Sequence, residues 1–243
     1  MTDEWTYEPA HDLGLSPRDR SRSLKRESGL LQTAGHFLWG VFTRAYFRVW
    51  HRLQVIGREH LPLRPPFVLI GNHASHLDAL LLATPLPLTI RDRVFPLAAG
   101  DVFFEKTTTA LFAMSLLNAL PLWRRKCTPH ALAELRARLV KEPCAFILFP
   151  EGGRSRDGAM MAFKPGLGML VAGMEVPVVP CHIAGAFAAL PPNCRLPRPH
   201  KIVLRIGPAL HFGHLANDRA GWEEAARCCE ATVQELAVRP KDS

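Results

Sequence analysis

The sequence lacks several features that would assign it to common classes of protein. It has no uninterrupted apolar run of about 18 residues or more, so a membrane-spanning helix is not expected. Its first residues are polar and lack the apolar core of a signal peptide, so no secretory leader is expected. The six cysteines show no framework spacing, which indicates reduced thiols in a cytosol-facing protein. A Gly-x-Ser-x-Gly elbow is also missing, which argues against a serine nucleophile of that kind.

Signals for nucleic acid and for metal are missing too. There is no zinc-finger spacing, no aromatic cluster of the RNA-binding type and no long basic helix. His211 and His214, with the adjacent Cys228 and Cys229, match no zinc pattern, so no metal is expected. The net charge is nevertheless +8. This balance favours an anionic partner, and we expect a membrane surface or a phosphorylated substrate rather than nucleic acid.

The amino-terminal part of the chain divides into two segments. Residues 1–28 are polar and basic, which predicts a mobile tail. Residues 29–52 contain an amphipathic helix over Leu30 to Trp50, because apolar residues recur there at helical spacing. The apolar stripe consists of Leu30, Leu31, Ala34, Phe37, Leu38, Val41, Phe42, Ala45, Tyr46 and Val49, and the opposite side carries Gln32, Thr33, His36, Thr43, Arg44 and Arg48. Aromatic residues flanked by arginines indicate a membrane-associating helix in the headgroup zone. The alternative is an ordinary helix whose stripe docks on the core.

Residues 53–238 alternate short buried strands with helices. The expected strands are 55–57, 67–70, 94–98, 145–149, 176–183 and 201–206, and the expected helices are 78–83, 107–120, 129–142, 166–174 and 218–238. This alternation predicts an α/β fold with a layered, largely parallel central sheet flanked by helices. The chain has 243 residues, of which 48% are hydrophobic, enough for one such domain with a large core.

Candidate chemistry begins where the strand at 67–70 ends. Asn72 and His73 follow that strand, and Asp78 lies five residues after His73. The strand end fixes the imidazole, and the turn can bring Asp78 back to one ring nitrogen, which leaves the other free to accept a proton. The stretch from Ser75 to Asp78 also fits a capping box, so a carboxylate that only caps the next helix is the alternative.

Charged residues and glycines follow other elements of the same pattern. Glu151, Gly152, Gly153 and Arg154 come after the strand at 145–149, Lys164 lies just beyond them, and Arg124 follows the helix at 107–120. In parallel sheets, sites collect outside the carboxyl ends of the strands. Arginine binds phosphate in a bidentate manner and glutamate accepts from hydroxyls, while the two glycines allow close approach of a ligand. The set predicts a site for a polyol phosphate.

Four ordered blocks resemble those of the PlsC-like glycerolipid acyltransferases, the 1-acylglycerol-3-phosphate acyltransferase-like family. The blocks are Asn72-His73-(four residues)-Asp78, an HxxxxD motif; Pro121 to Arg124; Phe149-Pro-Glu-Gly-Gly-Arg-Ser155; and Val176-Pro-Val-Val-Pro180. The resemblance covers roughly residues 50–210. The resemblance implies an α/β fold and acyl transfer to a hydroxyl of a lysophospholipid. The donor would be acyl-CoA or acyl carrier protein, a co-substrate rather than a bound cofactor.

The resemblance also implies roles for individual residues. His73 matches the family's base and Asp78 its orienting partner, and Arg124 matches the second block's arginine. Glu151, Gly152 and Arg154 match the block that binds the glycerol phosphate, and residues 176–180 match the acyl-side packing block. Asn72, Gly153 and Lys164 complete the expected substrate-binding set.

Two departures from the family pattern bear on the acceptor. The third block usually has threonine where Gly153 stands, and the second usually opens with glycine where Asn118 stands. We expect 1-acylglycerol 3-phosphate as the acceptor, giving phosphatidic acid. The alternatives are another lysophospholipid, a lyso-ornithine lipid, glycerol 3-phosphate, or a non-catalytic lipid-binding protein of the same fold. The expected location is peripheral, on the cytoplasmic face of a membrane.

Overall fold

The structure, a computed structural model, describes residue 14 and residues 30–99, 118–122, 129–192, 194 and 196–238. Apart from Gly14, the tail expected at residues 1–28 lies outside these residues. Most of the helix expected at 107–120 lies outside them as well. Its last three positions are described, and they are not helical.

A seven-stranded sheet forms the centre of the described part of the chain, in the order β1-β7-β6-β2-β5-β3-β4. Its strands are β1 (Gln54–Ile56), β2 (Phe67–Gly71), β3 (Val94–Ala99), β4 (Leu120–Leu122), β5 (Ala145–Leu148), β6 (Val178–Ala184) and β7 (Val203–Ile206). The central strand β2 runs parallel to both β5 and β6, and β3 runs parallel to β5 and β4. Among the pairings of the described strands, that of β6 with β7 alone is antiparallel. The predicted α/β fold with a largely parallel sheet is therefore confirmed, although β4 stands where the end of a helix was expected.

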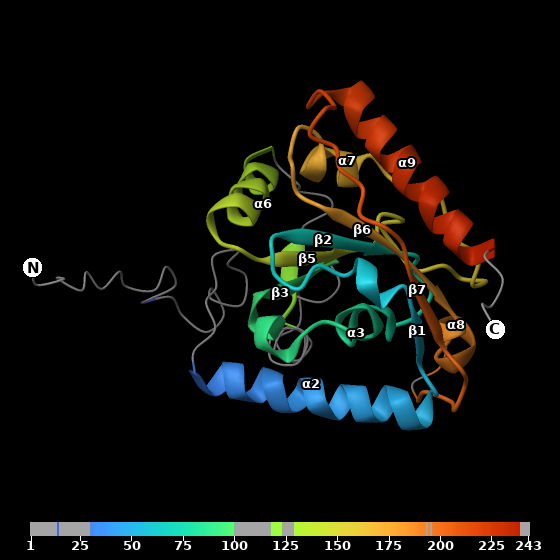
Figure 1. Cartoon of the computed structure of the whole chain (residues 1–243). Coiled ribbons are helices and arrows are strands. Elements are labelled where there is room, and N and C mark those ends of the chain that lie inside the picture. Colours follow the sequence, from blue (N-terminus) through green and yellow to red (C-terminus); the bar gives the residue numbers. More distant parts are fainter. Residues whose placement is uncertain are drawn as a thin grey trace, which may run out of the picture.

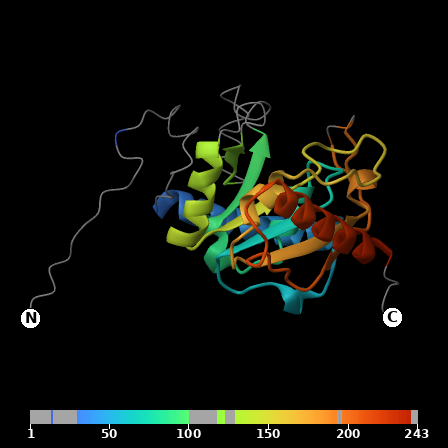
Figure 2. The same cartoon turned by 90° about the horizontal axis from the view of Figure 1, so that it is seen from above.

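Both faces of the central strands are covered, which explains their unbroken apolar sequences. Phe67 and Leu69 of β2 pack into one core, whereas Val68 and Ile70 pack into the other. The first core lies toward helices α2 (Leu30–Trp50), α3 (Asp78–Ala83) and α8 (Ala186–Ala189) and the 3-10 helix η2 (Leu88–Arg93), and the second toward α6 (Pro129–Lys141), α7 (Gly166–Val171) and α9 (Arg219–Val238). Figure 1 shows α2 and α3 below the sheet and α7 and α9 above it. From above, α9 crosses in front of the sheet (Figure 2).

Helix α2 packs on the domain with the side that carries His36, Thr43 and Phe47, all of which are buried. Arg44 donates to the carbonyl oxygens of Thr84 and Leu86, beyond the end of α3. Among the described side chains of α2, six large apolar ones are exposed: Phe37, Leu38, Val41, Phe42, Val49 and Trp50, with exposed fractions of 45% to 77%. Docking of the apolar stripe on the core is therefore wrong, because most of the stripe faces away from the domain. None of the described helices combines the length and the hydropathy needed to cross a membrane.

Candidate active site

The turn after β2 brings His73 and Asp78 into direct contact. Nδ1 of His73 lies 2.9 Å from Oδ2 of Asp78. The same carboxylate oxygen accepts the backbone N–H groups of Ala74 and Ser75, both at 2.7 Å. The Asp78 side chain is 1% exposed and that of His73 is 22% exposed. Asp78 therefore holds the backbone of the turn before α3 and orients the imidazole at once.

The Ser75 hydroxyl does not cap α3. It donates to the carbonyl oxygen of Leu190 at 2.9 Å and accepts the N–H of Leu77 at 3.3 Å. The residue before α3 is Leu77, and no side chain bonds to the helix start from that position. Ser75 instead ties the turn to the chain after α8, which adds a second anchor to the segment between His73 and Asp78.

The segment after β5 holds His73 from the other side. The Phe149 ring stacks on the imidazole, with ring centroids 4.1 Å apart and planes 16° apart. Oε1 of Glu151 accepts the backbone N–H of His73 at 2.7 Å, and the N–H of Ser155 donates to the His73 carbonyl at 2.8 Å. Since β2 and β5 are neighbours in parallel register, their carboxyl ends meet at one edge of the sheet, as the sequence predicted.

Glu151 braces the main chain on both sides of the site. It is 2% exposed, and its second oxygen accepts the N–H of Met161 at 3.0 Å. Burial raises the pKa of Glu151, whereas the hydrogen bonds from Met161 and His73 lower it. Because both oxygens are buried and already bonded to backbone, the geometry argues against the predicted contact with a substrate hydroxyl and favours a supporting role.

Asn72 is engaged in a similar way. Its side chain is 6% exposed. Oδ1 accepts the N–H of Ile183 at 2.7 Å and Nδ2 donates to the Ile183 carbonyl at 3.0 Å. The last paired residues of the two strands are Gly71 and Cys181, so the amide continues the β2–β6 ladder with side-chain atoms. This link between strands argues against the predicted contact of Asn72 with substrate.

The predicted cations and glycines differ in their surroundings. Arg154 is half-buried, and burial lowers its pKa while the nearby Asp78 carboxylate raises it. Its Nη1 has no hydrogen-bond partner within the described residues. Lys164 is exposed and lies over Gly152, where an added Cβ would stand 2.8 Å from Nζ and φ is +72°. An added Cβ at Gly153 would meet no atom within 4 Å, so the threonine usual in the family would fit there.

Two points remain about the residues of the expected site. Arg124 lies outside the described residues, so the structure does not place it. Phe149 and Ser155 were noticed only as parts of a motif, and sequence reasoning missed their contacts with His73. The sequence indicated that the two strand ends meet. The register that aligns Phe149 with His73 depends on both strands, so neither segment alone predicts it.

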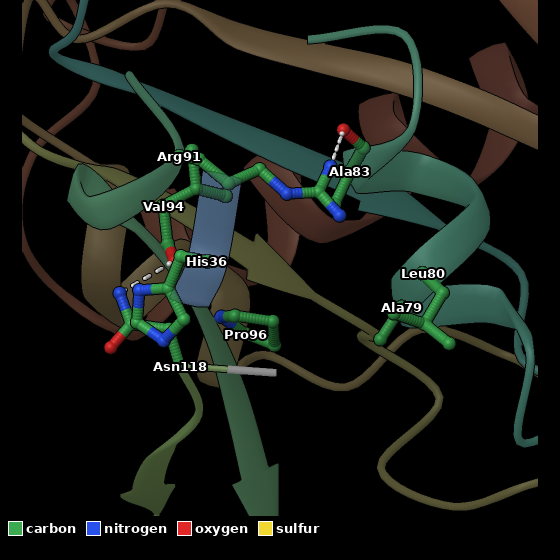
Figure 3. Close-up of a pocket in the computed structure, with 8 residues that line it drawn as sticks. All are labelled: His36, Ala79, Leu80, Ala83, Arg91, Val94, Pro96 and Asn118. Carbon is green, nitrogen blue, oxygen red and sulfur yellow. Dashed lines mark hydrogen bonds between the residues drawn. The ribbon is translucent and has the colours of Figure 1, made fainter. Parts of the chain in front are cut away.

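A small cavity lies between α2, α3, η2 and β3 (Figure 3). Its lining is apolar along α3 and β3 and polar elsewhere: His36, Ala79, Leu80, Ala83, Arg91, Val94, Pro96 and Asn118. Arg91 donates to the Ala83 carbonyl at 2.6 Å and to the Thr43 hydroxyl at 3.3 Å. Burial and the nearby Arg44 lower the pKa of Arg91 to about 10, so it stays charged at neutral pH and helps to fasten α2 to α3.

Comparison with known proteins gives the family. A family profile described as Acyltransferase matches residues 52–184. The 1-acyl-sn-glycerol-3-phosphate acyltransferase alpha of Homo sapiens is 30% identical over 131 residues, and that of Mus musculus is 28% identical over 129 residues. Each alignment covers 53% of this chain but 44% of the relative, so this chain matches less than half the length of those proteins.

A solved structure shares the fold. It is the crystal structure of the 1-acyl-sn-glycerophosphate acyltransferase PlsC from Thermotoga maritima, with a TM-score of 0.63 and 24% sequence identity. The superposition covers 86% of this chain and 81% of that one. The family profile spans more than half of this sequence and includes the His73–Asp78 turn and the segment from Phe149 to Ser155. The chain therefore belongs to the acyltransferase family.

Proposed function

We propose that this protein transfers an acyl group from an acyl thioester to the free hydroxyl of 1-acylglycerol 3-phosphate, which gives phosphatidic acid. The donor is acyl-CoA or acyl carrier protein. The observation that carries the proposal is the His73–Asp78 pair, with a buried carboxylate at 2.9 Å from an imidazole on a side chain that is 22% exposed. The names of the relatives, which are 1-acyl-sn-glycerol-3-phosphate acyltransferases, support the choice of acceptor.

His73 acts as the general base in this mechanism. Its Nδ1–H donates to Asp78, so Nε2 is left to take the proton of the acceptor hydroxyl. The acceptor oxygen then forms a bond to the thioester carbonyl carbon, the C–S bond breaks, and the imidazolium returns its proton to the leaving thiolate. Asp78 holds the tautomer and stabilises the imidazolium, as the carboxylate does in a serine protease triad, here without an enzyme nucleophile.

The acceptor phosphate binds to the cations beside this pair. Arg154 lies near Asp78, and its buried Nη1 has no hydrogen-bond partner among the described residues, while a guanidinium suits the planar, bidentate recognition of phosphate. Lys164 adds an exposed charge over Gly152. We assign Arg124 to the same phosphate on the strength of its motif. On this account, Arg154→Gln raises the KM for the acceptor more than it lowers kcat.

An acceptor panel tests the proposal. One labelled acyl-CoA is offered with 1-acylglycerol 3-phosphate, another lysophospholipid, a lyso-ornithine lipid and glycerol 3-phosphate, and thiol release is followed together with the labelled product. The proposal expects the highest kcat/KM with 1-acylglycerol 3-phosphate. A preference for another acceptor would indicate an acyltransferase of the same family that acts on that acceptor. Lipid binding that survives His73→Ala, without thiol release for any acceptor, would instead indicate a non-catalytic lipid-binding protein.

We also propose that α2 holds the protein on the cytoplasmic face of a membrane as a peripheral contact. Six exposed apolar side chains on α2, next to the exposed Arg48 in a chain of net charge +8, support a helix lying in the headgroup zone of an anionic surface. Vesicle flotation tests this contact. Leu38→Glu or Val49→Glu should weaken binding to vesicles containing phosphatidylglycerol by about tenfold or more, because each apolar side chain contributes about 1.5–3 kcal/mol when buried. Val140→Glu on α6, also at an exposed valine, is the matched control and should bind as the wild type does.

A further inference from the structure

The imidazole of His73 is covered on two sides by groups with different chemistry. Asp78 occupies its Nδ1 edge at 2.9 Å, and the Phe149 ring covers one face at a centroid distance of 4.1 Å. The side chain still keeps 22% of its surface exposed. Asp78 and Phe149 thus cover one edge and one face of the ring, and neither of them covers the opposite face or the edge that carries Nε2, which the proposed reaction uses.

We propose that Phe149 is a positioning residue for acyl transfer: its ring fixes the plane of the His73 imidazole and stabilises the imidazolium formed when Nε2 takes the acceptor's proton. This inference rests on the proposed role of His73 as the base. Phe149 acts through His73, and no contact between Phe149 and a substrate is assumed.

Fixing the plane is needed because Asp78 offers one oxygen to the ring. A single Nδ1–H···Oδ2 bond leaves the ring free to twist about that bond, and a twist redirects Nε2. A parallel aromatic ring at 16° blocks the twist on one side. Phe149 is itself held, since it is partly buried and packs against the core on the α2 side of the sheet. The stack thus joins the reacting ring to the core.

Stabilising the imidazolium follows from the charge distribution of the benzene ring. Its face is negative, so a cation placed over it is attracted, and the attraction grows as water is removed. The neutral imidazole gains little from this field, whereas the imidazolium gains more. The gain is therefore realised as the proton arrives at Nε2, and interactions of that kind raise kcat rather than lower KM.

The aromatic face, rather than the volume of the side chain, is the property that matters. Leucine fills much of the same space without a π face, and tyrosine keeps the face. Phe149→Leu and Phe149→Tyr thus separate packing from stacking. The matched control is Phe95→Leu on β3, where a buried phenylalanine ring also stacks with a cation, Arg138, at 4.4 Å from the ring centroid, but in the other core.

The kinetic test uses thiol release with saturating acyl-CoA and 1-acylglycerol 3-phosphate. Phe149→Leu should lower kcat by about 3- to 30-fold, the range that a cation–π contact supplies, with both KM values within about twofold. The acid limb of its pH–rate profile should move to lower pH, because the imidazolium has lost a stabilising contact. Phe149→Tyr should keep the wild-type kcat within about twofold and the wild-type acid limb. Phe95→Leu should lose stability without either kinetic change.

A kcat for Phe149→Leu equal to that of the wild type would overturn the proposal. A Phe149→Tyr variant as slow as Phe149→Leu would also overturn it, because a variant that keeps the aromatic face should keep the rate. A second readout needs no turnover. Relaxation of the His73 ring nuclei in 13C-labelled protein should show a fixed ring in the wild type and a more mobile ring in Phe149→Leu, while the Nδ1–H tautomer that Asp78 sets stays the same in both. Absence of turnover with every acceptor would refute the proposed function, while unchanged mobility of the His73 ring in Phe149→Leu would refute the positioning role by itself.

Discussion

Replacement of Glu151 by glutamine tests whether this carboxylate supports His73 or binds substrate. The two oxygens of Glu151 accept the N–H groups of His73 at 2.7 Å and of Met161 at 3.0 Å. Glutamine has nearly the same shape but only one oxygen. In either orientation its NH2 group faces a backbone N–H, so one buried donor loses its acceptor.

The expected loss of stability follows from this unpaired donor. A buried donor left without a partner costs about 1–3 kcal/mol, and hydrogen bonds to charged groups lie toward the upper part of that range. The desolvation that raises the pKa of Glu151 offsets part of the loss, because glutamine carries no charge to bury. We expect a net loss of about 1–3 kcal/mol in the free energy of unfolding. Since a misplacement of about 1 Å can cost about 100-fold in rate, we expect kcat to fall by about 10- to 100-fold.

The assay is thiol release at varied acceptor concentration, with denaturation in urea measured on the same samples. The matched control is Glu230→Gln, because Glu230 accepts the N–H of Phe163 at 2.8 Å in the same loop and does not touch His73. Glutamine at position 230 keeps one oxygen for Phe163, and the other Glu230 oxygen accepts only the exposed Gln234 side chain, so the control should lose less stability than Glu151→Gln and keep its kcat. A Glu151→Gln protein with the wild-type kcat and a raised KM for the acceptor would refute the supporting role and restore direct substrate binding.

Four further substitutions probe the surroundings of the site. Asn72→Ala should lower the free energy of unfolding in urea by about 2–4 kcal/mol, because two buried backbone groups of β6 lose their partners; a loss below about 0.5 kcal/mol would contradict the link to β6. Burial and Arg205 lower the pKa of His182 from 6.5 to about 4, so the stability from its neutral form is complete above pH 6.5 and is lost as the pH falls toward 4. As the pH falls between those values, the free energy of unfolding of the wild type should fall by up to about 3 kcal/mol more than that of His182→Gln. Equal losses would contradict the lowered pKa of His182. Gly152→Ala should cost about 1–3 kcal/mol in thermal or urea unfolding because of its positive φ, whereas Gly153→Ala should stay within about 0.5 kcal/mol; equal costs would contradict the geometry of the loop.

The local parts of the site could be predicted from the sequence. His73 and Asp78 are separated by one turn, so their contact depends on a buried strand and a helix start that the sequence marks clearly. The helix begins at Asp78, as expected. The meeting of the segments after β2 and β5 could also be predicted, because it follows from the parallel order of the strands rather than from any single contact.

The roles of Glu151 and Asn72 could not be predicted in the same way. Both side chains reach backbone groups far along the chain, at His73 and Ile183. Such bonds depend on the register of neighbouring strands to within one residue, and hydrophobic pattern does not set the register of a strand that is buried on both faces. The motif alone therefore assigned both residues to the substrate, whereas the structure shows backbone partners for their side chains.

Helix α2 shows a different limit of sequence reasoning. The period of its apolar residues defines a stripe, but not whether the stripe faces the core or the surroundings. The docked side uses Phe47 together with Arg44, whose guanidinium satisfies carbonyl groups beyond the end of α3. Polar residues with specific backbone partners thus formed the interface, and the wider apolar face was left exposed. Periodicity alone contains no information on those partners.

The most direct measurement of the central claim is thiol release by His73→Ala from acyl-CoA in the presence of 1-acylglycerol 3-phosphate. Wild type and variant are compared at equal concentration, after circular dichroism and urea unfolding have shown that both are folded. The account predicts that the variant loses at least about a hundredfold in kcat, since a general base contributes about 10²- to 10⁴-fold, while it still binds lipid vesicles. Turnover retained at the wild-type rate by a folded His73→Ala protein would contradict the assignment of His73 as the base.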